Sequence, residues 1–195
     1  MIRRIKEFTE RAYRTACEHG FHDKELPVEH LMMLVVSEIG EMVEADRKNR
    51  HAQRTAIEYC TNHPEEIDQK SWCTYFERDI KDTVEDELAD VTIRIFDFCG
   101  TFGLDVPAFD NVDDLAANWK ELFSDAMLTE NAFALVQLCS GVFNELPKNE
   151  LSNCMGQILY FIHFWASHLN IDLVWHVENK LRYNESRERL HGKKY

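Results

Sequence analysis

Residues 31–45 read LMMLVVSEIGEMVEA, and they predict a long helix that packs inside the protein. At about 100° per residue, one side of this helix is apolar, and its stripe consists of Leu31, Leu34, Val35, Met42 and Ala45. Glu38 falls inside the stripe and Glu41 at its border, whereas Glu44 points away from it. An ionised carboxylate among apolar side chains is unfavourable unless it is paired or binds a metal. Two of these glutamates therefore need a cationic partner.

A second stretch, VEDELADVTIRIFDFCG at 84–100, repeats this arrangement. Its apolar stripe consists of Val84, Leu88, Val91, Ile95 and Phe98. The charged side chains on one adjoining facet are Glu87, Asp90, Arg94 and Asp97. A helix that is apolar on most sides and charged on one facet is typical of a buried helix that faces a polar cleft. If the two helices pack antiparallel, we expect four carboxylates to converge, namely Glu38, Glu41, Glu87 and Asp90.

Converging carboxylates predict a metal site. They cannot all stay ionised without cations, and hard oxygen ligands select Mg²⁺, or alternatively Mn²⁺, over zinc. A di-iron helical bundle would carry Glu-x-x-His pairs, and neither stretch contains one. For one pair of carboxylates alone, a solvated or salt-bridged face is the more common explanation. Two pairs on two apolar helices favour metal ligation.

The composition of the chain favours an all-α protein. Its 195 residues are 45% hydrophobic and 11% aromatic, which is ample for the core of one domain. Seven glycines and four prolines provide few turns, so long helices are expected rather than strands. Residues 51–75 lack a clear period and predict an inserted, partly helical excursion. We expect helices near 2–19, 27–49, 76–102, 131–146, 151–169 and 173–183, with a short one near 113–123.

A weak internal repeat suggests how these helices are organised. LVVSEIGEMVE at 34–44 aligns with LVQLCSGVFNE at 135–145, and the second copy has Cys139 and Val142 in place of Glu38 and Glu41. Chance alignment of two similar hairpins is the alternative. We expect a single all-α domain, a helical bundle over 1–195. Its parts are the candidate catalytic hairpin over 1–106 with the excursion 51–75, a degenerate second hairpin over 107–176, and a basic tail over 177–195.

Charge and cysteine usage limit the classes of partner and compartment. The net charge of −13, from 35 acidic and 22 basic residues, repels a phosphate backbone and argues against nucleic-acid binding. The most apolar run, at 155–175, is interrupted by polar residues, which argues against a membrane span. Six cysteines without a C-x-x-C pair, and an acid-containing amphipathic start, favour a reducing cytoplasm over secretion.

The order of four motifs resembles a known enzyme family. SEIGEMVEA (37–45) and DELAD (86–90) are preceded by EHGFHD (18–23) and followed by KLRYNESRERLHGKKY (180–195). Together they resemble the all-α nucleoside triphosphate pyrophosphohydrolases, that is, the MazG-like enzymes and the related dimeric all-α dUTPases. The resemblance implies hydrolysis of a nucleoside triphosphate to the monophosphate and pyrophosphate. The implied Mg²⁺ ligands are Glu38, Glu41, Glu87 and Asp90, and Glu38 or Glu41 would act on the water.

The resemblance also implies substrate contacts and a homodimer. The implied phosphate-binding residues are Lys180, Asn184 and Arg187, and the implied base contacts are Phe21 or His22. The chain departs from the compact family pattern in the excursion at 51–75 and over 107–172. Two alternatives stay open: a pyrimidine-specific dUTPase or dCTPase, and a non-catalytic helical scaffold or regulatory protein that kept the fold.

Overall fold

The structure is a computed structural model, and it describes residues 1–107 and 123–192. Every regular element in these ranges is helical, so the prediction of an all-α fold is confirmed. The α-helices are α1 (Ile5–Glu18), α2 (Val28–Arg47), α3 (Thr55–Asn62), α4 (Gln69–Asp79), α5 (Val84–Phe102), α7 (Leu128–Ser140), α8 (Lys148–His168) and α9 (Leu173–Glu185). Two short 3-10 helices are η1 (Ile2–Arg4) and η2 (Arg189–Gly192).

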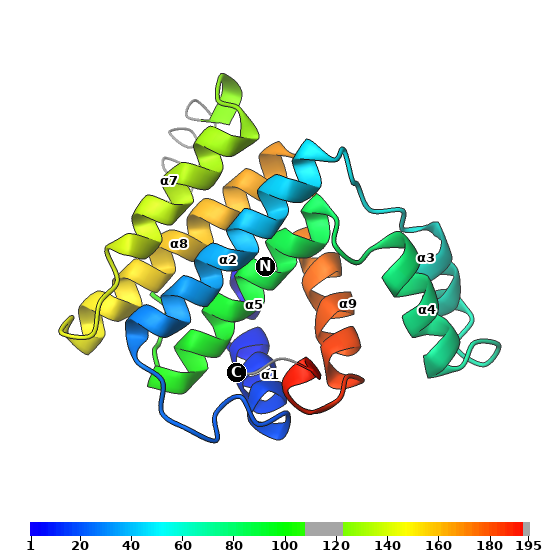
Figure 1. Ribbon diagram of the computed structural model, residues 1–195, viewed down its shortest axis with the longest axis horizontal. Coiled ribbons are helices and arrows are strands. Elements are labelled where there is room, and N and C mark those ends of the chain that lie inside the picture. The colour runs from blue at the N-terminus through cyan, green and yellow to red at the C-terminus, as the bar shows by residue number, and fades with distance from the viewer. Residues whose placement is uncertain (108–122, 193–195) are drawn as a thin grey trace.

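Helix α5 is the central element of the fold. It contacts α1, α2, α8 and α9, while α7 packs against α2 and α8 (Figure 1). One continuous hydrophobic core joins these helices, as the stripes on α2 and α5 predict. Phe96 of α5 stacks on Phe8 of α1 with 5.5 Å between ring centroids. Full burial of such a side chain contributes about 1.5–3 kcal/mol to the free energy of unfolding. Contacts of this kind on several sides therefore stabilise the position of α5.

The ends of α5 and its contact with α1 depend on particular residues. Thr83 caps the start, because its side chain accepts a hydrogen bond from the backbone N–H of Asp86. Gly103 ends the helix with φ at +57°, a left-handed conformation that glycine adopts without strain. A Cβ at Gly100 would collide with Tyr13, so this glycine allows α1 to lie close to α5. The charged facet of α5 is thereby brought beside α1.

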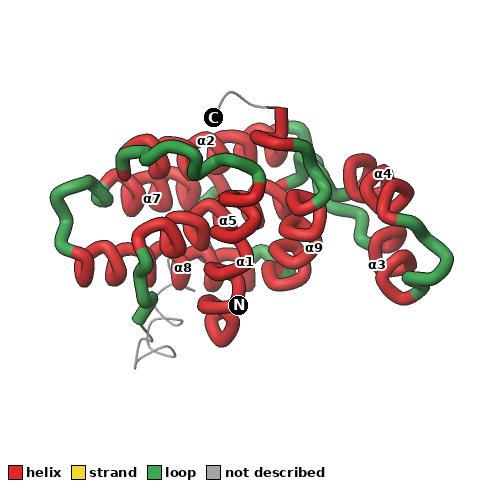
Figure 2. The backbone as a smooth tube through the Cα atoms, turned by 90° about the horizontal axis from the view of Figure 1, so that it is seen from below, coloured by secondary structure: helices red, strands yellow, loops and turns green. Residues whose placement is uncertain are grey.

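The excursion forms an arm of two helices, and its expected boundary is wrong. The helix expected from 76 begins only at Val84, because Phe76 belongs to α4 and Asp82 adopts a φ of +59° between the two helices. Helices α3 and α4 project from the bundle (Figures 1 and 2) and share a small core around Trp72 and Phe76. Phe76 stacks on Tyr183 of α9 at 4.7 Å. The arm therefore packs against the last helix rather than extending α5.

The second hairpin also starts and ends at other residues than expected. Helix α7 ends at Ser140 instead of near 146, and α8 begins at Lys148, before the expected 151. Pro147 is the N-cap of α8, and proline suits this end of a helix because the first N–H groups have no partner there. The short helix expected over 113–123 lies outside the described residues, apart from Phe123. Duplication of the first hairpin stays a prediction.

Within the ranges that the structure describes, no helix is both long and apolar enough to cross a membrane. All six cysteines lie in these ranges as free thiols.

Candidate metal centre and adjoining cavity

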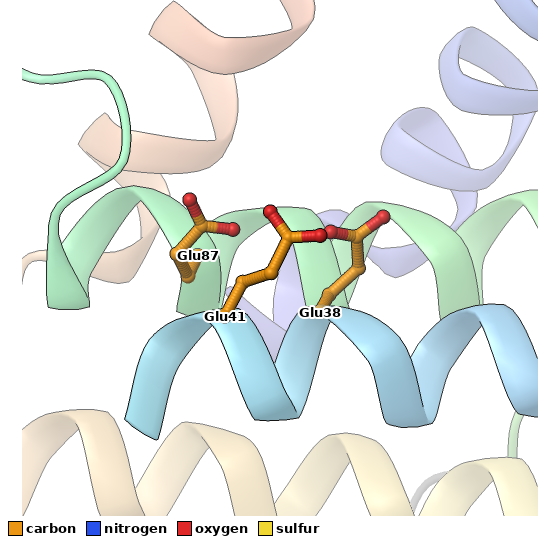
Figure 3. A group of neighbouring side chains, drawn as sticks. All are labelled: Glu38, Glu41 and Glu87. Atoms are coloured by element: carbon orange, nitrogen blue, oxygen red, sulfur yellow. The ribbon is translucent and has the colours of Figure 1, made fainter. Parts of the chain in front are cut away.

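Three glutamates from two neighbouring helices meet on one side of the bundle. Glu38 and Glu41 come from α2 and Glu87 from α5, and all three point to the same side of these helices (Figure 3). One carboxylate oxygen of each lies within 4.8 Å of the others. Glu38 and Glu87 are buried, whereas Glu41 is exposed. The structure thus brings together three of the four carboxylates that the helical spacing predicts to converge.

The donor set of these three residues fits a hard divalent cation. Mg²⁺ takes oxygen ligands at about 2.1 Å, so two ligand oxygens of one ion lie about 3–4 Å apart. The three carboxylate oxygens, within 4.8 Å of one another, are close to this spacing. Oε2 of Glu87 is buried and has no hydrogen-bond partner among the described residues. Burial, followed by the negative charge of Asp90, raises the pKa of Glu87 to about 9. A bound cation would displace this proton and satisfy the oxygen.

Asp90, the fourth predicted ligand, forms an ion pair with Lys180. Nζ of Lys180 lies 2.7 Å from Oδ2 of Asp90 and 2.6 Å from Oδ2 of Asp86. Both Lys180 and Asp86 are buried, at 4% and 1% exposure. Burial acts to lower the pKa of Lys180, but the two carboxylates outweigh it and the net pKa is raised. Lys180, a predicted phosphate ligand, is thus held next to the cluster as a buried cation between two aspartates.

Two residues of this centre had no assigned role in the sequence analysis. Asp86 looks like one more acidic residue in the first turn of a helix, where the helix dipole favours it, and only its burial beside Lys180 sets it apart. Arg94 donates hydrogen bonds from Nε and Nη2 to Oε1 of Glu38, at 3.1 and 3.0 Å. In the sequence, the position of Arg94 on the charged facet of α5 was the feature that could have indicated this contact. This contact orients Glu38, as partners of metal ligands commonly do.

A cavity extends from the cluster along α5 towards α1 and the C-terminal turn. The residues that line it are Ala12, Thr15, Ala16, Phe21, Glu38, Asp90, Ile93, Arg94, Asp97, Leu181, Asn184, Arg187 and His191. Three predicted substrate-binding residues are among them, namely Phe21, Asn184 and Arg187. Oδ1 of Asn184 is buried without a partner among the described residues. His22 is not part of the lining, and its Nε2 lies 2.7 Å from Oδ1 of Asp97.

The cavity is partly closed by the C-terminal turn. Its volume is about 70 Å³, well below the roughly 300–1,000 Å³ of typical ligand pockets. His191 of η2 packs edge-on against Phe21, with 5.0 Å between ring centroids, and Leu190 donates its N–H to the carbonyl of His19. His191 and its contact with Phe21 thus narrow the cavity at the C-terminal turn.

A second hollow lies beside the same glutamates. It is lined by Glu41, Glu44, Ala45, Lys48, Arg50, Asp82 and Glu87. Glu44, the glutamate that points away from the apolar stripe, forms surface ion pairs with Arg47 and Lys48 at 3.0 and 3.1 Å. Lys48 and Arg50 add positive charge near Glu41 and Glu87, a feature that the sequence analysis did not assign. The acidic cluster thus lies between two hollows with cationic side chains in each.

The high pKa of Glu87 predicts how the stability of the metal-free protein depends on pH. The ordinary pKa is 4.5, and in the folded protein it is about 9. Between these values the folded state binds more protons than the unfolded state, so the free energy of unfolding falls as pH rises, by at most about 1.4 kcal/mol per pH unit. Urea unfolding in EDTA from about pH 7 to about pH 9 should show this fall. Burial lowers the pKa of His176 to about 4 and that of His191 to about 3, both below this window.

The matched variant for this measurement is Glu87→Gln, which keeps the shape of the side chain and does not titrate. We expect its pH profile to be flatter than that of the wild type over the same window. Parallel profiles would contradict a protonated Glu87 in the metal-free protein.

The arrangement can hold a hard cation next to a cavity that contains arginine and asparagine side chains. Such a site suits a ligand with negatively charged oxygens, because the metal and Arg187 can both contact them. Comparison with known proteins assigns no family: no protein-family model, no curated protein and no solved structure matches the chain.

Proposed function

We propose that the protein is a Mg²⁺-dependent nucleoside triphosphate pyrophosphohydrolase, with Mn²⁺ as a possible substitute, that releases a nucleoside monophosphate and pyrophosphate. The observation that carries the proposal is the convergence of Glu38, Glu41 and Glu87 on two apolar helices. Mg²⁺ held by carboxylates completes its coordination with water and with substrate phosphates. The order of the sequence motifs, which resembles the all-α pyrophosphohydrolases, supports the same reaction.

Each residue of the centre has a separate role in the proposed reaction. A bound Mg²⁺ supplies polarisation of the phosphate and a water of lowered pKa. Glu41 is the exposed member of the cluster, so its carboxylate is accessible to orient the attacking water and accept its proton. Arg94 keeps Glu38 in place through its two hydrogen bonds. Lys180, bound to Asp86 and Asp90, offsets negative charge beside the cluster.

The cavity would bind the parts of the substrate that the metal does not contact. Arg187 and Asn184 line it together with Asp90 and Glu38, and we infer that they contact the phosphates. Phe21 lies in the same lining and offers a ring on which a base can stack. A base that stacks on Phe21 would replace the contact of His191 with this ring.

The proposal includes a homodimer in the cytoplasm. Met33 of α2 and Phe133 of α7 are exposed at 59% and 64%, although both are large apolar side chains. Single exposed apolar side chains are common on protein surfaces, so the homodimer is supported by the resemblance, which favours a second copy of the chain as the partner. The six free thiols are in keeping with a reducing compartment.

Product analysis tests the proposed function. The wild-type protein is incubated with each of the common nucleoside and deoxynucleoside triphosphates, with Mg²⁺ or with EDTA, and the products are separated by anion-exchange chromatography. We expect nucleoside monophosphate and pyrophosphate in equal amounts, only with the divalent cation. Formation of diphosphate and inorganic phosphate would indicate a different phosphohydrolase, and absence of any product would refute the proposal.

A further inference from the structure

The charged facet of α5 continues beyond the metal centre to Asp97. Asp90 and Asp97 both line the cavity described above. They are seven residues apart on one helix, and a rise of 1.5 Å per residue separates them by about 10 Å along its axis. A nucleotide has a similar distance between its phosphates and its base. If the phosphates bind at the cluster, the base therefore comes to lie near Asp97.

The carboxylate of Asp97 is held in one orientation. Oδ1 lies 2.7 Å from Nε2 of His22, and the two side chains are only 13% and 14% exposed. The ring of His22 in turn packs against Tyr13, with 5.0 Å between centroids. A partly buried carboxylate that a neighbour holds in place can discriminate between hydrogen-bond donors and acceptors on a ligand. Since an ionised carboxylate only accepts hydrogen bonds, it favours a ligand group that donates.

We propose that Asp97 selects the base, and that the enzyme favours triphosphates whose base carries an exocyclic amino group, as cytosine, adenine and guanine do. The inference rests on the proposed function. An amino group donates to a carboxylate, as the exocyclic amine of cytosine does to aspartate or glutamate. Uracil and thymine present two carbonyl oxygens on either side of one N–H, so at least one carbonyl would face the carboxylate. Between the two pyrimidine-specific alternatives, Asp97 favours a dCTPase over a dUTPase.

A sugar hydroxyl is the other nucleotide group that an aspartate commonly binds. The base is the better match, because Asp97 and Phe21 line the same cavity, and Asp97 lies about two helical turns from Asp90 along α5. Phe21 offers the stacking surface, and Asp97 offers the hydrogen-bond acceptor at the edge of the base. The experiment below separates the two groups by comparing ribose with deoxyribose substrates.

The test compares kcat/KM for dCTP, dATP, dGTP, dUTP, dTTP, CTP and UTP in the wild type and in Asp97→Asn. We expect the wild type to favour the amino-bearing bases by about 10- to 100-fold. The asparagine keeps an acceptor for His22 and adds an N–H donor that suits a carbonyl, so we expect the preference to fall at least about tenfold. Asp105→Asn is the matched control, because Asp105 is exposed in the loop after α5, and its preference should equal that of the wild type.

Three results would overturn the inference. The wild type could treat all bases alike, Asp97→Asn could lower kcat/KM equally for all substrates, or the variant could alter only the ratio of CTP to dCTP, which would assign Asp97 to the sugar. If Asp97→Asn does not fold, as judged by thermal unfolding, the base preference of the wild type alone tests the inference.

Binding separates this inference from the proposed function. Non-hydrolysable α,β-imido analogues of dCTP and dUTP are titrated into the wild type and Asp97→Asn with Mg²⁺ by calorimetry. A preference for the dCTP analogue that the variant loses, without hydrolysis of any triphosphate, would refute the function and keep the inference. Hydrolysis without base preference would support the function and refute the inference. Absence of nucleotide binding would refute both.

Discussion

Replacing Glu41 with glutamine should lower kcat for the preferred triphosphate by about a thousandfold while leaving the protein as stable as the wild type. A metal centre contributes several kcal/mol of charge stabilisation in the transition state, and each 1.36 kcal/mol corresponds to a factor of ten in rate. Glu41 is the exposed member of the cluster, so its replacement removes a ligand without disturbing the core. Steady-state kinetics with Mg²⁺, together with urea unfolding, measure both quantities.

The matched control is Glu44→Gln, one turn further along the same helix. Glu44 forms surface ion pairs with Arg47 and Lys48, and such pairs contribute little, so this variant should retain wild-type activity and stability. Glu38→Gln should also lose activity, although its stability can fall as well because Glu38 is buried and bound to Arg94. Equal activity of Glu41→Gln and Glu44→Gln would refute the cluster as the catalytic metal site.

Replacing Lys180 with methionine should lower the free energy of unfolding by about 3–5 kcal/mol. Methionine fills a similar volume but leaves Asp86 and Asp90 facing each other without their shared cation. Asp86 is 1% exposed, so water cannot replace the lost partner. Urea unfolding at neutral pH measures the change, and the same variant should be less destabilised at acidic pH, where the aspartates are protonated.

Two further variants distinguish the effect of leaving buried charges unpaired from the effect of removing any lysine. Lys48→Met, on the surface of the molecule, should change the free energy of unfolding by no more than about 0.5 kcal/mol. The double variant Lys180→Met with Asp86→Asn should recover part of the loss, since one of the two unpaired charges is removed. A Lys180→Met protein as stable as Lys48→Met would mean that the buried triad does not form.

Local periodicity was enough to predict the acidic cluster. Glu38 and Glu41 lie one turn apart, as does Glu87 with Asp90, and Glu38 falls inside an apolar stripe while the other three lie beside one. Because 3.6 residues per turn determine which side chains share a face, the shared face of these carboxylates could be inferred before their neighbours were known. The breaks in that periodicity were harder to place: Phe76 continues the apolar pattern towards α5, yet it packs with Trp72 in the arm.

The sequence by itself therefore determined the helical class, the two carboxylate-bearing helices and which of their glutamates share a face. Only the tertiary structure decided that Lys180 binds Asp86 and Asp90, and that Arg94 holds Glu38. The physical reason is distance along the chain. Helical periodicity relates residues within a few turns, whereas Lys180 and Asp86 are 94 positions apart and meet only because α9 packs on α5.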